Sequence, residues 1–262
     1  MDRITAIIPT FNEEVNIKEA IESVLWCDEI IVVDSFSRDR TVEIVKSFPD
    51  VRLLMHEYEH SAAQKNWTIP QATHQWVFLL DADERPTPEL VEEIKAVVKN
   101  GTNYSGFWIY RRNHFMGKRI NYSGWQSDKV IRLFKRDECR YQNKHVHAEI
   151  ESKGQIGVLK QKLIHYTYKD LDSYLRKADR YTTWGALDRV QKFEKRGHKV
   201  GLPYLFLRPV GRFFRHYLLR LGILDGTHGF VIAALAATNV FIRALKIWRL
   251  QSGEKLEDPF KK

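Results

Sequence analysis

The sequence is poor in cysteine and contains no long uninterrupted apolar run. Its two cysteines, Cys27 and Cys139, are too few and too far apart for a disulfide framework or a ligand pair, so a reducing compartment is expected. No basic segment with an apolar core precedes the strand-like run at 4–9, and we expect no signal peptide. Residues 226–242 carry no charge, but a membrane span usually needs about 18–20 apolar residues. This stretch is therefore predicted to be a buried or membrane-dipping helix.

A glycine-rich turn is also missing after the first strand-like run, where residues 10–14 read TFNEE. Dinucleotide oxidoreductases place phosphate-binding glycines at that point, so the sequence disfavours that class. No internal repeat or low-complexity stretch is evident.

What the chain does contain is typical of a globular protein. Of its 262 residues, 44% are hydrophobic and 12% aromatic, enough for one large domain, with or without a tail. Apolar runs without polar alternation are separated by segments of helical spacing. This pattern predicts an α/β fold with a mostly parallel sheet covered on both faces. The expected strands are 4–9, 29–34, 51–55 and 76–80, and the expected helices are 16–25, 40–48, 62–73 and 88–99.

The second half of the chain has a different pattern. Strand-like runs at 106–112, 130–135 and 161–165 are joined by irregular segments, and a long helix is expected over 171–195. We predict a catalytic domain over 1–198, with a donor half at about 1–100 and an acceptor half at about 101–198, and a helical tail over 199–262.

Polar clusters follow three of the first four strands. Asp34 ends the second strand, and Asp81 and Asp83 follow the fourth. Because parallel strands end at one edge of a sheet, these groups are expected to converge there. The two closely spaced carboxylates suit Mg²⁺ or Mn²⁺ with a diphosphate, although capping or pairing with Arg85 is the alternative. Asp34 suits a ribose hydroxyl or a base N–H, and Lys65 suits a phosphate.

These segments carry a family resemblance. Residues 4–14 (ITAIIPTFNEE), 30–41 (IIVVDSFSRDRT), 64–66 (QKN) and 79–88 (LLDADERPTP) resemble the family-2 glycosyltransferases of the GT-A fold. The later motifs are similar to the lipopolysaccharide-core β-glycosyltransferase branch, and the match covers nearly the whole chain. These later motifs are Gly124-Trp125 with Asp128, the IRLF run at 131–134, Val146-His147, residues 204–209 and Leu224-Asp225-Gly226.

The resemblance implies roles by position. Pro9, Phe11 and Glu13 would lie along the nucleotide base, and Asp34 would contact the base or ribose. Asp81 would contact the ribose or a metal-bound water. Asp83 would ligate the metal.

The chain also departs from the family pattern. Phe36 and Arg38 stand where a small residue and a threonine are usual, so the turn after Asp34 differs from the family pattern where the nucleoside would bind. Ala148 follows His147 where a glutamate is usual.

The remaining site residues come from the second half. An inverting transfer needs a base for the acceptor hydroxyl, and Asp128 is favoured over Glu149. An ion pair of Asp128 with Lys129 or Arg132 is the alternative reading. His147 is a candidate metal ligand, better suited to Mn²⁺ than to Mg²⁺.

The tail is strongly basic. Residues 199–262 hold 11 Lys or Arg and 4 Asp or Glu, and so carry +7 of the net charge of +9. On a helical wheel over 208–221, Arg208, Arg212 and Arg215 oppose an apolar face, and Pro209 is placed at a helix start. This arrangement predicts an interfacial helix on an anionic membrane, with packing or oligomerisation as the alternative.

We therefore predict an inverting, metal-dependent glycosyltransferase. It would move a sugar, with glucose as a candidate, from a UDP-sugar to a lipid-linked or lipopolysaccharide-core glycan. The enzyme would be cytoplasmic and peripheral on the inner face of a bacterial cell membrane, with no nucleic-acid partner. The rival functions are a haloacid-dehalogenase-like phosphatase, disfavoured by Arg85, and a non-catalytic sugar-nucleotide binder.

Overall fold

The computed structural model describes residues 3–143 and 148–256 and divides into two compact units. The sheet unit comprises Met1–Arg112 and Asp128–Tyr166, and the helical unit comprises Asn113–Ser127 and Thr167–Lys262. Each unit is a set of residues that contact one another more than they contact the rest of the chain. The predicted boundary between a catalytic domain and a tail at residue 198 is a different division, and it stays a prediction.

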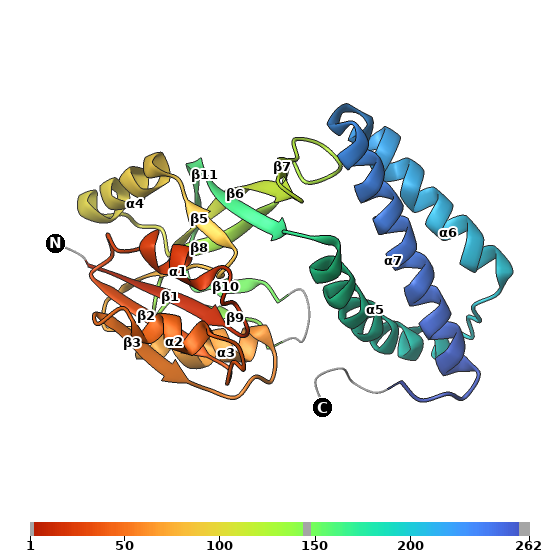
Figure 1. Ribbon diagram of the computed structural model, residues 1–262, viewed down its shortest axis with the longest axis horizontal. Coiled ribbons are helices and arrows are strands. Elements are labelled where there is room, and N and C mark those ends of the chain that lie inside the picture. The colour runs from red at the N-terminus through yellow and green to blue at the C-terminus, as the bar shows by residue number, and fades with distance from the viewer. Residues whose placement is uncertain (1–2, 144–147, 257–262) are drawn as a thin grey trace. The chain divides into compact units, whose positions relative to one another are not determined.

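The parallel half of the sheet is built from the first four strands. They are β1 (Ile4–Thr10), β2 (Glu29–Asp34), β3 (Val51–Met55) and β4 (Trp76–Leu79), in the spatial order β3-β2-β1-β4 and all parallel (Figure 1). The helices between them are α1 (Ile17–Glu22), α2 (Thr41–Lys46) and α3 (Ser61–Thr68), followed by the short 3₁₀ turn Ile69–Gln71. The β-α alternation predicted from the sequence is confirmed.

Successive residues of these strands enter different core clusters. Ala6, Ile8 and Val32 pack in one cluster, whereas Ile7 and Ile31 pack in the other. Side chains alternate between the faces of a strand, so apolar residues at consecutive positions require cover on both faces. This is why these strands read as continuous apolar runs.

Helix α4 (Pro88–Asn100) begins as predicted. The Thr87 side chain accepts a hydrogen bond of 3.2 Å from the Leu90 backbone N–H, and Pro88 occupies the first turn. The helix buries Leu90, Ile94 and Val98 against the sheet core.

The remaining strands extend the sheet mainly in antiparallel fashion. β8 pairs antiparallel with β4 and with β6, and β11 pairs antiparallel with β5. β5 was not predicted: it begins at Glu84, one residue after Asp83, where we expected a turn. The bounds are β5 (Glu84–Pro86), β6 (Gly106–Phe115), β7 (Lys118–Arg119), β8 (Lys129–Lys135), β9 (Cys139–Tyr141), β10 (Ile150–Ser152) and β11 (Ile156–Tyr168).

The helical unit contains α5 (Leu171–Glu194), α6 (Leu202–Phe214) and α7 (Thr227–Gln251). The predicted start of the basic helix was wrong. α6 begins at Leu202 with a proline in its first turn, and Pro209 lies inside the helix. A π-helical turn, Arg215–Leu219, continues α6, and the 3₁₀ turn Gly222–Asp225 precedes α7.

Helix α7 contains the uncharged stretch noted in the sequence. It is long and apolar enough to cross a membrane, with a mean hydropathy of 1.8 over a window that is 28% buried. A single helix of this kind is weak grounds for a membrane span, because core helices of soluble proteins pass the same test.

Candidate active site

The carboxyl ends of β1, β2 and β4 meet at one edge of the sheet. Thr10 lies opposite Asp34 in the β1–β2 pairing, and the Leu80 N–H donates to the Ile7 carbonyl at 2.9 Å. The polar segments that follow these strands are therefore neighbours, as the parallel pattern predicted.

The loops after β1 and β2 hold each other in place. The Asn12 N–H donates to Ser37 Oγ at 2.8 Å, and the Arg38 N–H donates to Asn12 Oδ1 at 2.8 Å. The buried carboxylate of Asp34 accepts from the Ser37 N–H at 2.7 Å and from Ser37 Oγ at 2.5 Å. The Glu13 N–H donates to Thr41 Oγ1 at 2.8 Å. Asp34 therefore shapes this rim, and its oxygens have capacity for further donors.

Two aromatic rings stand exposed on the same loops. Phe11 is 40% and Phe36 is 53% exposed, while Pro9 is half-buried at the end of β1. An exposed ring beside a buried carboxylate can stack on a nucleotide base while the carboxylate accepts hydrogen bonds.

Asp81 sits between two cations. Its Oδ1 lies 2.8 Å from the Lys65 Nζ, and its Oδ2 pairs with the Arg132 guanidinium. Lys65 is buried on α3, and its Nζ lies 5.3 Å from the Tyr141 ring centroid. Lys65, predicted as a phosphate ligand, is therefore at the sheet edge beside Asp81 rather than on the solvated surface.

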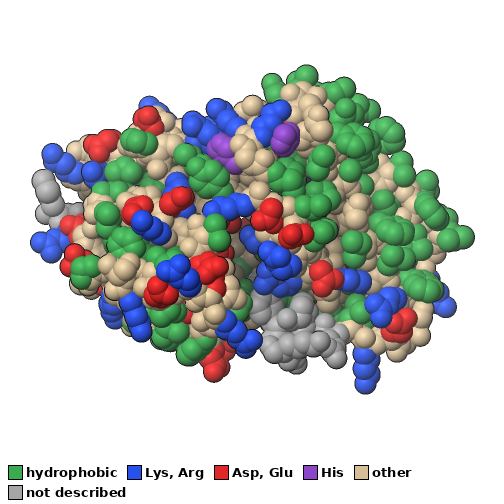
Figure 2. Space-filling view, in the orientation of Figure 1, with side chains coloured by type: hydrophobic (Ala, Val, Ile, Leu, Met, Phe, Trp, Pro, Cys, Tyr) green, Lys and Arg blue, Asp and Glu red, His purple; other side chains and the backbone are tan. Residues whose placement is uncertain are grey.

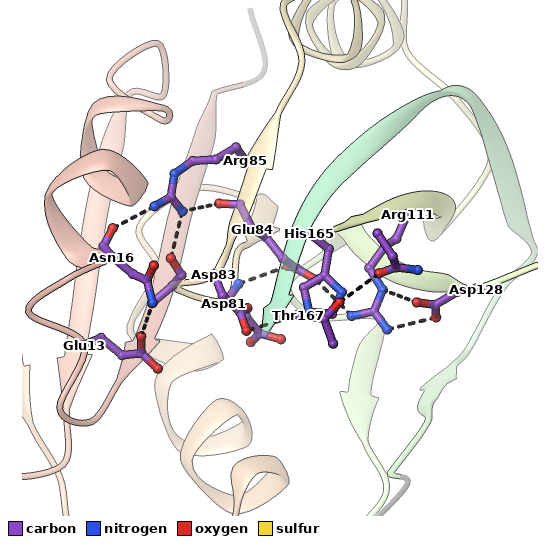
Figure 3. A network of polar contacts seen from close by, with 12 residues as sticks. Glu13, Asn16, Asp81, Asp83, Glu84, Arg85, Arg111, Asp128, His165 and Thr167 are labelled. Atoms are coloured by element: carbon purple, nitrogen blue, oxygen red, sulfur yellow. Dashed lines mark hydrogen bonds and ion pairs between the residues drawn. The ribbon is translucent and has the colours of Figure 1, made fainter. Parts of the chain in front are cut away.

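A second buried carboxylate extends this network (Figure 3). Glu84 is fully buried and accepts from Arg132 Nε and Nη2, both at 2.8 Å, and from Arg111 Nη1 at 3.2 Å. Arg111 in turn holds Asp128 in a bidentate pair, with Nε–Oδ2 at 3.0 Å and Nη2–Oδ1 at 2.8 Å. The predicted base is thus ion-paired, and its partner is Arg111 rather than Lys129 or Arg132.

The network moves the pKa values of Asp81, Lys65 and Arg132 further from neutrality. Burial alone would raise the pKa of Asp81, but Arg132 and Lys65 outweigh it and lower that pKa. Burial alone would lower the pKa of Lys65, but Asp81 raises it. The pKa of Arg132 is also raised, because Asp81 and Glu84 outweigh its burial. These groups are therefore fully charged at neutral pH.

Asp83 lies on the other side of the turn. Its Oδ2 is 3.7 Å from His165 Nε2 of β11, and its carbonyl accepts from the Tyr166 N–H at 2.9 Å. His147, the predicted imidazole ligand, lies outside the described residues. Within residues 3–143 and 148–256, no three His, Cys, Asp or Glu side chains gather closely enough to hold a metal ion.

These residues nevertheless fit a metal that arrives with its substrate. Mg²⁺ and Mn²⁺ bound to phosphates commonly need only one or two protein carboxylates, since phosphate oxygens and water complete the shell. The Asp83 carboxylate supplies a hard oxygen ligand of that kind, and the His165 imidazole lies 3.7 Å from it. The site does not resemble a closed cage made by protein ligands alone.

A pocket of ≈ 300 Å³ opens beside the network, lined by Lys65, Asp81, Arg111 and Arg132 together with Glu149. Trp108 and Lys129 also line it, with the Lys129 Nζ 4.6 Å from the Trp108 ring centroid. Among the described lining residues Glu149 is present, whereas Asp128 is not. The structure thus brings Lys65, Asp81 and Glu149 to one cavity.

The sequence analysis missed Glu84, Arg111 and Tyr141, and it considered Arg132 only as an ion-pair partner. The one sequence signal that could have pointed to Glu84 is its position directly after the Asp81-Ala82-Asp83 motif. Glu84 lies in β5, which pairs with β11 at residues 77 to 81 positions further along the chain, and local pattern does not reveal such a contact.

Comparison with known proteins agrees with this geometry. The sequence matches Glycosyl transferase family 2 over residues 5–156, more than half of the chain. It is 29% identical over 255 residues to the lipopolysaccharide core biosynthesis glycosyltransferase LpsC of Rhizobium meliloti (strain 1021), covering 94% of this chain and 92% of that one. It is 28% identical to the uncharacterized glycosyltransferase RT0209 of Rickettsia typhi (strain ATCC VR-144 / Wilmington), covering 95% and 88%.

Among solved structures, S. aureus TarS 1–349 is similar over 97% of this chain and 93% of that one, with 15% identity and a TM-score of 0.46. The glucosyl-3-phosphoglycerate synthase of Mycobacterium tuberculosis, crystallised with Mn²⁺, uridine diphosphate and phosphoglyceric acid, covers 42% of this chain and 44% of that one. Its identity is 21% and its TM-score is 0.38. Both likenesses are too distant to argue for a substrate. The sequence match and the architecture agree on the GT-A fold, and the chain belongs to glycosyltransferase family 2.

Proposed function

We propose that this glycosyltransferase moves a sugar, with inversion, from a uridine diphosphate donor to a hydroxyl of a lipid-linked or lipopolysaccharide-core glycan. The observation that carries the proposal is the sheet edge, where Asp34 ends β2 and Lys65 pairs with Asp81 in the lining of a pocket. Asp83 follows two residues after Asp81. The similarity to LpsC, a lipopolysaccharide core glycosyltransferase, supports this acceptor class. Family membership sets aside the rival phosphatase.

In this proposal the two loops after β1 and β2 hold the nucleoside. Phe11 and Pro9 lie along the base, Asp34 accepts from the base or ribose, and Glu13 contributes from the first loop. The pairing of the two loops through Asn12 and Ser37 supports a preorganised rim.

The diphosphate would lie toward Lys65 and Asp81. Lys65 is held charged and buried, so it can meet a phosphate oxygen without first losing a hydration shell. Asp83 would hold the divalent metal, with His147 as the proposed second ligand. The metal supplies charge neutralisation for the leaving diphosphate.

We assign the base to Glu149. The sequence favoured Asp128, but both of its carboxylate oxygens accept hydrogen bonds from the Arg111 guanidinium, so this carboxylate is already engaged in an ion pair. Glu149 is exposed and lines the pocket with Lys65 and Asp81. Asp128 then acts as a positioning residue that fixes Arg111.

The proposed location is the cytoplasmic face of a bacterial membrane, reached reversibly. α6 has no buried residue although most of its side chains are apolar, and Figure 2 shows hydrophobic side chains gathered over the helical unit. An apolar surface next to arginines is typical of interfacial binding. Self-association through these helices is the alternative use of the same surface.

A transfer assay tests the function directly. Purified protein is incubated with radiolabelled UDP-glucose, Mn²⁺ and truncated lipopolysaccharide or a lipid-linked glycan, and labelled lipid is extracted. We expect transfer that requires metal and is lost in Asp83→Asn. A screen in which only guanosine or cytidine donors are used would refute the uridine assignment. Absence of transfer from every nucleotide sugar to every such acceptor would refute the proposed reaction.

A further inference from the structure

A second pocket lies entirely within the helical unit, and none of its lining residues is among those proposed for sugar transfer. Its volume is ≈ 290 Å³, and five of its eight lining residues are arginines. The arginines come from α5 (Arg189), α6 (Arg208, Arg212), the π-helical turn (Arg215) and α7 (Arg243), and Tyr204, Gly211 and Val240 complete the lining. Three helices distant in sequence therefore contribute cations to one cavity.

Among the described residues, these arginines meet no acidic counterpart. In the part of the chain that the structure describes, no Asp or Glu lines the pocket, and no ion pair involves any of the five. Burial, followed by neighbouring arginines, lowers the pKa of both Arg212 and Arg243. Like charges gathered in a partly buried cavity are destabilising unless an anion joins them.

The guanidinium groups that line the pocket suit a phosphate group. Planar guanidinium groups bind phosphate oxygens in bidentate fashion, which lysine cannot do. The Arg208 guanidinium stacks 4.5 Å from the Tyr204 ring centroid, which fixes its plane. A Cβ at Gly185 would come within 3.1 Å of Arg243 Cδ, so this glycine lets the Arg243 side chain lie close to α5.

The surroundings indicate where the phosphate comes from. On the same helix, Phe206, Leu207, Val210 and Phe214 are 52% to 70% exposed. A soluble anion needs no apolar surface next to its site, whereas a lipid phosphate brings acyl chains that such a surface can bury. Charge favours a group with more than one negative charge, since a phosphodiester would leave four of the five arginines uncompensated.

We propose that this pocket binds the phosphomonoester or diphosphate headgroup of a membrane lipid, with the apolar side chains of α6 entering the acyl region. The inference rests on the proposed membrane association, and it is independent of which sugar is transferred. The proposal assigns part of the basic charge of the tail to one defined site. Arg189 and Arg243 contribute to this site, although they lie outside the predicted basic helix.

Vesicle co-sedimentation tests the proposal. Phosphatidic acid vesicles offer a phosphomonoester, and phosphatidylglycerol vesicles offer a diester; the two are matched in measured surface potential. We expect the wild-type chain to bind phosphatidic acid at least about tenfold more tightly. The Arg189→Gln/Arg243→Gln variant should lose this preference, while the charge-matched control Lys195→Gln/Lys199→Gln, both exposed, should keep it.

A second variant removes no charge. Nothing lies within 4 Å of a Cβ added at Gly211, so Gly211→Leu introduces an apolar side chain into the pocket lining with no clash at its Cβ. It should lose the preference while still binding UDP in calorimetry, and retained UDP binding separates this result from failure of the transfer site.

Equal binding of the two vesicle types by the wild-type chain would overturn the proposal. A preference that survives Gly211→Leu would also overturn it. A third result would also overturn it. If inorganic pyrophosphate binds, Gly211→Leu abolishes that binding, and neither vesicle type is preferred, then the pocket holds a soluble anion and not a lipid headgroup.

Discussion

Replacing Glu84 with glutamine tests whether the buried ion network stabilises the sheet edge. The glutamine keeps one acceptor oxygen but loses the charge that faces Arg132 at 2.8 Å and Arg111 at 3.2 Å, and it points an NH₂ group at a guanidinium. Glu84 is fully buried and Arg132 is nearly so, so no water replaces the lost partner. Removing one member of a buried pair typically costs about 3–5 kcal/mol.

Differential scanning calorimetry measures this cost. A loss of that size should lower the unfolding temperature by about 6–20 °C for a chain of this length. The matched control is Glu43→Gln, which makes the same chemical change in the exposed pair with Arg40, and we expect no measurable shift there. If the two variants unfold at the same temperature, the network does not stabilise the fold, and the account of this edge is wrong.

Three further changes probe the site and its support. Because the pKa of Asp81 is lowered below its ordinary 3.8, its contribution to stability is present above pH 3.8 and is lost as pH falls through the folded pKa. The gap in unfolding temperature between wild type and Asp81→Asn should therefore shrink in acid, and a gap constant from pH 7 to 3 would contradict this. Glu149→Gln should lower turnover by about 10²–10⁴-fold without weakening UDP binding, while Asp128→Asn should keep more activity. The reverse ranking would restore Asp128 as the base. Thr87→Ala should cost about 1 kcal/mol in urea unfolding by removing the cap of α4, and an unchanged midpoint would contradict the assignment.

The parallel half of the sheet was predictable because its information is local. Apolar runs at consecutive positions, such as residues 29–34, predict a strand covered on both faces, and parallel strands bring the residues that follow them to one edge. Thr87 followed by Pro88 marked a helix start in the same local way. Asp34, Asp81 and Asp83 could therefore be placed before the structure was known.

The ion network was not predictable because its members meet only through distant pairings. Arg111 lies on β6 and Arg132 on β8, and both reach Glu84 only once these strands join the sheet. No sequence spacing links them. The preference for Asp128 over Glu149 relied on a motif alone, and a motif does not show that Arg111 occupies the carboxylate.

In the tail, too, local features were predictable and contacts between distant segments were not. Helical spacing correctly grouped Arg208, Arg212 and Arg215, which line one pocket. The helix start at Pro209 was wrong because α6 begins at Leu202, with another proline in its first turn, and continues through Pro209. Arg189 and Arg243 lie on other helices, so only tertiary packing adds them.

Calorimetric titration of UDP tests the central claim most directly, because metal-dependent nucleotide binding at Asp83 distinguishes this site from a structural cluster of carboxylates. UDP is titrated into wild type, Asp83→Asn and the control Asp50→Asn, with Mn²⁺ and again with a chelator. Asp50 is exposed and precedes β3, so it lies at the opposite end of a parallel strand from the site. We predict binding by wild type and Asp50→Asn only with Mn²⁺, and at least about a tenfold loss of affinity in Asp83→Asn. Equal affinity in all three proteins, with or without metal, would contradict the account.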